Sequence, residues 1–67
     1  MTSFVIYKDV SGQFRWRLVA GNGEKIAASE AYVSKQGAIT SATRVKVLAP
    51  SATIVDKTMV LPVRRLF

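Results

Sequence analysis

The chain has 67 residues, of which 49% are hydrophobic, and its ten Lys and Arg against four Asp and Glu give a net charge of +6. It contains no Cys and no His, which excludes disulfides and removes the usual ligands of zinc and other transition metals. This length allows one domain, which buries only about 60% of the surface that its unfolded chain exposes. With neither disulfide nor metal to support so small a core, we expect a partner subunit to supplement it.

The first 29 residues predict a three-stranded antiparallel meander. Each expected strand alternates apolar with polar side chains or is rich in β-branched and aromatic residues, and the strands cover residues 3–8, 14–20 and 24–29. The first turn, residues 9–12, suits a three-residue loop in which Gly12 takes the left-handed conformation. The second turn contains Asn22-Gly23, which is typical of a two-residue type I′ hairpin.

These turns fix a register and therefore two sheet faces. The expected cross-strand pairs are Phe4 with Leu18, Ile6 with Trp16, Tyr7 with Arg15, Val19 with Ile26, and Leu18 with Ala27. One face then collects apolar and small side chains, with Trp16 as a core residue: Phe4, Ile6, Phe14, Trp16, Leu18, Ala27 and Ser29. The other face is only half polar, and we expect something to cover part of it: Val5, Tyr7, Arg15, Arg17, Val19, Ile26 and Ala28.

One helix and one further strand complete the predicted α+β fold. Ser34 is a good N-cap for a helix from Lys35 to about Ala49, which Pro50 ends. Small residues recur on the helix at helical spacing and suit close packing on the sheet: Ala38, Ala42, Val45 and Ala49. Residues 52–56 predict a fourth strand, followed by an apolar tail over residues 57–67.

A recognisable series of residues runs in order along most of the chain: Phe4-Val5-Ile6-Tyr7-Lys8-Asp9, Gly12, Phe14-Arg15-Trp16-Arg17-Leu18, Asn22-Gly23, Ile26-Ala27, Ser29-Glu30, Tyr32, Ser34-Lys35 and Val45-Lys46. This series resembles the YegP-like family, small prokaryotic proteins classed as a domain of unknown function. The resemblance implies a β-β-β-α-β unit that occurs as a tandem repeat or as a single copy that dimerises, two units sharing one sheet and exchanging their C-terminal strands. It covers a domain over residues 1–56 and leaves residues 57–67 outside the pattern, as a C-terminal tail or an extension of the last strand.

The sequence argues against an enzyme. Without His or Cys, the commonest general bases and nucleophiles are missing, and the four carboxylates are scattered along the chain: Asp9, Glu24, Glu30 and Asp56. The Gly21-Asn22-Gly23 segment lacks the helix and Lys of a phosphate-binding loop. We therefore expect no catalytic residues, no cofactor, no metal and no small-molecule substrate.

A homodimer that serves as a protein-interaction or structural module is the leading functional hypothesis. The half-apolar sheet face and the apolar tail exceed what one small core absorbs, and both would be covered if the last strand and tail crossed to a second subunit. The candidate dimer contacts are Ile54, Val55, Met59, Val60 and Leu61. The alternatives for the tail are that it folds back on its own domain or forms a disordered end.

The second hypothesis is a sequence-tolerant nucleic-acid-binding accessory protein. Tyr7, Arg15 and Arg17 share one expected sheet face, where aromatic rings and guanidinium groups can stack bases and hold phosphates. The alternative is that the net charge only keeps a small apolar protein soluble.

The expected location is the cytoplasm. The N-terminus alternates like a strand instead of placing a basic region before an apolar stretch, so we expect no signal peptide. No apolar run reaches the roughly 18 residues needed to span a bilayer, and we expect no membrane contact.

Overall fold

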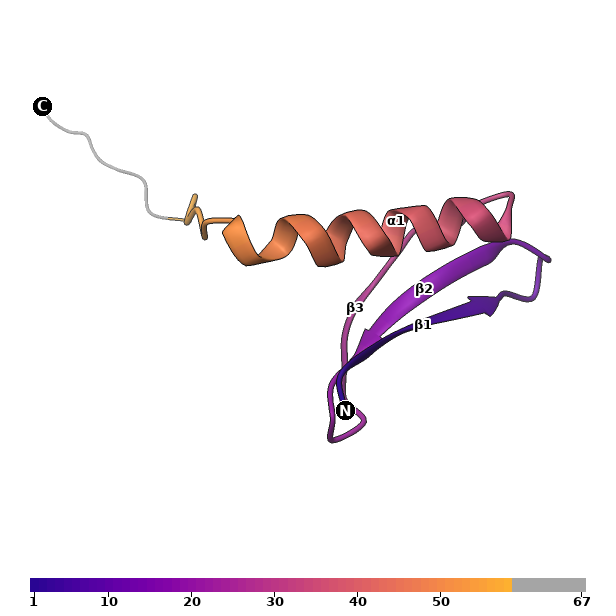
Figure 1. Ribbon diagram of the computed structural model, residues 1–67, viewed down its shortest axis with the longest axis horizontal. Coiled ribbons are helices and arrows are strands. Elements are labelled where there is room, and N and C mark those ends of the chain that lie inside the picture. The colour runs from indigo at the N-terminus through magenta and orange to yellow at the C-terminus, as the bar shows by residue number, and fades with distance from the viewer. Residues whose placement is uncertain (59–67) are drawn as a thin grey trace, which may run out of the picture.

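The structure is a computed structural model that describes residues 1–58, and it consists of one antiparallel sheet with a single helix across one face (Figure 1). The strands pair in the order β1-β2-β3. The elements are β1 (Ser3–Lys8), β2 (Phe14–Val19), β3 (Lys25–Ala28), α1 (Lys35–Leu48) and the short 3₁₀ helix η1 (Ala49–Ser51). The predicted α+β class, the meander and the single helix are confirmed.

The first hairpin forms in the predicted register. Phe4 pairs with Leu18, Ile6 with Trp16, and Tyr7 with Arg15. The loop is closed by the Asp9 N–H, which donates to the Gln13 carbonyl at 2.8 Å. Gly12 has φ of +85°, the left-handed conformation that only glycine adopts without a steric penalty, so the turn residue sets the pairing of both strands.

The second hairpin differs from the prediction. It has a three-residue loop, Gly21-Asn22-Gly23, because the Ala20 N–H donates to the Glu24 carbonyl and the Gly23 N–H donates to the Ala20 carbonyl. Val19 therefore pairs with Lys25, and the predicted pairing of Val19 with Ile26 is wrong. An irregularity between Leu18 and Val19 shifts the register by one residue and restores the predicted pairing of Leu18 with Ala27.

Helix α1 begins where its cap predicts and packs through its smallest residues. The Ser34 side chain accepts a hydrogen bond from the Gly37 N–H at 2.9 Å, as an N-cap does. Ala38 and Ala42 are buried against the sheet together with Trp16, and within residues 1–58 these three form the whole buried apolar core. The Phe4 ring meets Trp16 edge-on, with centroids 5.2 Å apart, which confirms that Trp16 is a core residue.

The predicted fourth strand is absent. Residues 52–56 belong to no helix or strand and are exposed, Ile54 by 99% and Val55 by 69%. The C-terminal end of α1 runs past the sheet and carries the following segment away from it (Figure 1). A strand needs a neighbouring backbone for its hydrogen bonds. Among the described residues no strand lies within reach of this segment, so it does not form one.

Ser41 joins the three parts of the core by hydrogen bonds. Its hydroxyl oxygen accepts a bond from the Trp16 indole N–H at 3.0 Å and another from the Tyr32 hydroxyl at 2.8 Å. Trp16 lies on β2, Tyr32 follows β3, and Ser41 lies on α1. One side chain thereby holds the helix to the sheet and to the connector.

Replacing Ser41 by alanine is expected to destabilise the domain by about 1–3 kcal/mol, because two partly buried donors lose their acceptor. Urea denaturation followed by Trp16 fluorescence measures the loss. Thr40→Ala is the matched control, since Thr40 is exposed and bonds only weakly to Gln36 at 3.3 Å. Equal stability of both variants would contradict the role given to Ser41.

Candidate functional site

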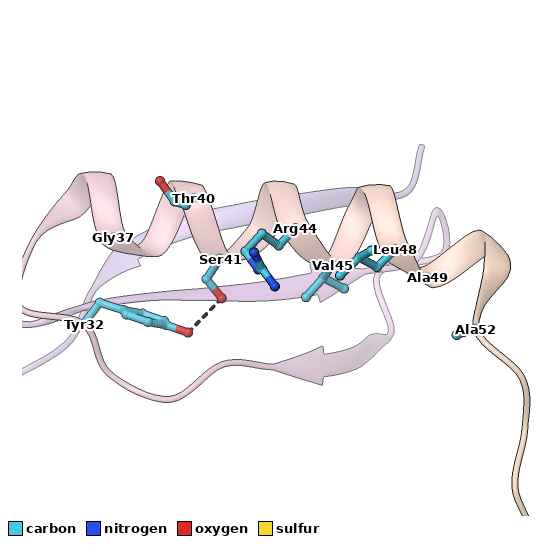
Figure 2. Close-up of a pocket in the computed structure, with 9 residues that line it drawn as sticks. All are labelled: Tyr32, Gly37, Thr40, Ser41, Arg44, Val45, Leu48, Ala49 and Ala52. Carbon is cyan, nitrogen blue, oxygen red and sulfur yellow. Dashed lines mark hydrogen bonds between the residues drawn. The ribbon is translucent and has the colours of Figure 1, made fainter.

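Two open grooves flank α1, one toward each edge of the sheet. The first, here called the Tyr32 groove, has a volume of about 560 Å³ and is lined by Tyr32, Gly37, Thr40, Ser41, Arg44, Val45, Leu48, Ala49 and Ala52. Tyr32 bridges to Phe14 on the side of β2 where β3 lies, so this groove lies toward β3. Figure 2 shows it following α1, with Tyr32 at one end and Ala52 at the other.

The Tyr32 groove is apolar and has few free polar groups. The hydroxyls of Tyr32 and Ser41 bond to one another, as the dashed line in Figure 2 marks. Among residues 1–58, Arg44 is the one charged side chain in the lining, while Val45 and Leu48 contribute aliphatic surface. Small-molecule sites depend on convergent polar groups for orientation, so this lining suits an apolar chain segment better than a polar substrate.

The second groove, here called the Phe4 groove, lies toward β1 on the other side of α1. Its volume is about 460 Å³, and it is lined by Thr2, Ser3, Phe4, Ile6, Leu18, Ile39, Ala42, Thr43 and Lys46. Lys46 is the one charged residue that the described part of the chain contributes to this lining. Among residues 1–58, neither lining contains a carboxylate.

The sheet face opposite α1, here called the outer face, brings together the three candidate nucleic-acid contacts. Tyr7 pairs directly with Arg15, and Val5 pairs with Arg17. The Arg17 guanidinium lies over the Tyr7 ring, with its central carbon 4.2 Å from the ring centroid. Arg15 forms an ion pair with Asp9, whose carboxylate is 2.8 Å from the Arg15 Nε.

Asp9 holds the first turn together as well as binding Arg15. One carboxylate oxygen accepts bonds from the Ser11 N–H and hydroxyl and from the Gln13 N–H, and the other accepts from Arg15. The bond from Arg15, followed by that from the Ser11 hydroxyl, lowers the pKa of Asp9 well below its usual range. The same contact raises the pKa of Arg15.

Asp9→Asn is expected to lower stability at neutral pH but to matter less in acid. A depressed carboxyl pKa contributes stability that is fully present above the unfolded value of about 3.9 and is lost as pH falls toward the folded pKa. The difference in the free energy of unfolding between the native protein and the variant should therefore become smaller below about pH 4. Thermal unfolding followed by circular dichroism across this range measures it. The control is Glu24→Gln, at an exposed position, and a gap independent of pH would contradict the ion-pair explanation.

The candidate dimer contacts are only partly within the described residues. Ile54 and Val55 are exposed and contribute to neither groove of their own chain. Met59, Val60 and Leu61 lie outside the described residues, as does nearly all of the tail over residues 57–67. The structure thus leaves the role of these five residues as a prediction.

Two polar contacts were not foreseen from the sequence. Ser41 as the acceptor for Trp16 and Tyr32 could have been suspected, since a buried indole N–H nearly always has an acceptor. The ion pair between Asp9 and Arg15 follows from the first hairpin, which brings the turn next to the start of β2.

No group of three or more metal-ligating side chains comes together within residues 1–58. No helix in the same part of the chain has the length and apolar character to cross a membrane.

Comparison with known proteins places the chain in a family. Residues 9–56 match the family described as "Domain of unknown function (DUF1508)". A UPF0339 protein of Treponema denticola is 53% identical over 53 residues, which cover 79% of this chain and 91% of that protein. The solution structure of a protein from Haloferax volcanii is similar, with a TM-score of 0.75, 38% identity, and coverage of 82% of this chain and 93% of that one.

A second solution structure, of protein ATU0232 from Agrobacterium tumefaciens, has a TM-score of 0.72 and 40% identity. The match covers 87% of this chain and 94% of that one. Since the fold, the relatives and the family model agree over most of the chain, the expected YegP-like resemblance is confirmed. The chain belongs to the DUF1508 family, whose members include the UPF0339 proteins.

Proposed function

We propose that the protein is a non-enzymatic interaction module that works as a homodimer, in which residues 52–56 of each copy pack into the Tyr32 groove of the other. The observation that carries this proposal is the exposed aliphatic surface on both the segment and the groove. Ile54 and Val55 are exposed on the segment, and Leu48 is exposed in the lining of the groove.

The small size of the core is an argument for a second copy. Within residues 1–58 the buried apolar residues are Trp16, Ala38 and Ala42, which is little for a domain that lacks disulfides. Docking a second chain would bury further apolar area. Each Å² of apolar surface removed from water contributes about 25 cal/mol of stability. Dimerisation would thereby supply stability that the single chain lacks.

The edge of β3, toward which the Tyr32 groove lies, offers a place for the exchanged segment to pair as a strand. β3 is an edge strand, and all four of its residues are exposed. An exposed edge presents unpaired N–H and C=O groups that an incoming strand can satisfy. The end of α1 extends beyond the sheet (Figure 1) and directs residues 52–56 outward. Since no strand within residues 1–58 lies within its reach, such a segment would gain backbone partners from another chain.

The segment has the composition of a strand. Residues 52–56 read Ala-Thr-Ile-Val-Asp, and its three central residues are β-branched, which favours extended structure. Ile54 and Val55 would each lose exposed apolar surface on pairing. Exchange of identical segments between two copies gives a closed twofold dimer.

Replacing Ile54 by aspartate is expected to break the dimer. Losing one buried isoleucine costs at least about 1.5 kcal/mol in each copy, so the two symmetric sites together raise the dissociation constant about 100-fold or more. Light scattering coupled to size-exclusion chromatography over a concentration series measures the mass. The native chain should have the mass of two copies, and Ile54→Asp that of one.

Val10→Asp is the matched control, because Val10 is fully exposed in the first turn and lines neither groove. This variant should remain dimeric. A native chain with the mass of one copy at every concentration would overturn the proposal, and so would equal dissociation of the two variants.

A further inference from the structure

The outer face is a second surface that the dimer proposal does not use. α1 crosses the opposite face of the sheet (Figure 1), and among residues 1–58 no helix or strand packs over the outer one. Val5 and Ile26 are exposed there by 39% and 58%. Aliphatic, aromatic and guanidinium groups are therefore accessible side by side on a flat support.

Arg17 is held in a defined position on this face without a hydrogen bond at its Nε. Its guanidinium carbon is 4.2 Å from the centre of the Tyr7 ring, and the Nε, which is shielded from solvent, has no partner among the described residues. A cation over an aromatic ring is attracted by the ring's electrons, so Tyr7 fixes where Arg17 lies. The side of the guanidinium away from the ring then provides a flat cationic surface.

Arg15 adds a second charge in line with the first. The two arginines are two residues apart on β2 and so lie about 6.5 Å apart along the strand on the same face. Asp9 compensates part of the Arg15 charge through the Nε, but this bond uses only one of the five N–H donors of a guanidinium. The face therefore keeps an excess of positive charge beside its apolar groups.

We propose that the outer face binds single-stranded nucleic acid, with a base stacked on the Arg17 guanidinium and phosphates held by Arg15 and Arg17. Guanidinium planes stack bases in many single-strand sites, and exposed Val5 and Ile26 give neighbouring bases an apolar surface. An acidic peptide would satisfy the charges but would leave the flat stacking surface and the apolar flanks unused. Duplexes are excluded as the preferred ligand, since their bases cannot stack on a flat face.

Binding is tested with a fluorescein-labelled oligodeoxythymidine of about 12 nucleotides, using fluorescence anisotropy with the full chain over a salt series. Two phosphate contacts predict a slope of about −1.4 in a plot of log K against log salt. Arg17→Gln should weaken binding about tenfold and reduce the slope to about −0.7. Arg17→Lys keeps the charge but loses the plane, so it should weaken binding while leaving the slope near the native value.

The matched control is Lys35→Gln, which removes the same charge from α1 on the opposite side of the sheet and should change binding less than about twofold. The helical circular dichroism of each variant verifies its fold. Three results would each overturn the proposal: no binding at about 50 mM salt, equal losses in the glutamine variants of Arg17 and Lys35, or equal competition by polyglutamate. Ile54→Asp should still bind through its own outer face, which separates a failure here from a failure of the dimer.

Discussion

The close packing of α1 on the sheet is the constraint on which the rest of the structure depends. Ala38 and Ala42 have almost no side chain to separate helix from strand, so the helix backbone lies near Trp16. Ser41, one turn from Ala38, completes the contact by accepting the indole N–H. A small-residue stripe gives a precise fit but little buried apolar area, and the core is correspondingly thin.

This thin core explains why apolar side chains remain exposed elsewhere. A single helix covers only a strip along the middle of one sheet face, so open grooves remain on both of its sides. The helix also continues beyond the sheet and leaves Leu48 and the segment after η1 without support from the described chain. Within residues 1–58, large apolar side chains remain exposed, and a second copy as proposed would cover part of that surface.

Local chemistry made much of the fold predictable. Gly12 and the Ser34 cap act through their own backbone neighbourhood, and the structure confirms both. The prediction of a two-residue turn at Asn22-Gly23 was wrong, because this dipeptide also fits the second and third positions of a three-residue loop. Glycine at position 23 permits that loop with φ of +90°. The prediction of a strand over residues 52–56 was wrong for a different reason, since β propensity cannot supply the neighbouring backbone that a strand requires.

The candidate sites were less predictable than the fold, because they depend on side-chain contacts between elements. Alternation placed Tyr7, Arg15 and Arg17 on one face, and the observed register agrees. Alternation alone did not indicate that Arg17 would lie over Tyr7, and the contact of Asp9 with Arg15 depends on the hairpin that brings the turn next to β2. Those contacts change the chemistry of the face, since they cover one side of the aromatic ring and make the Arg17 guanidinium the exposed stacking surface.

The two proposed surfaces lie on opposite sides of the sheet and can therefore act together. The Tyr32 groove follows α1, whereas Arg17 and Tyr7 lie on the face that α1 does not cover. Because the exchanged segments would pack on the side of the sheet that carries α1, the proposed dimer would present two uncovered outer faces. A single strand bound to one face would meet the second at a high effective concentration, which raises affinity without any new contact. Dimerisation would then stabilise the domain and also double the length of strand that its weak individual sites can hold.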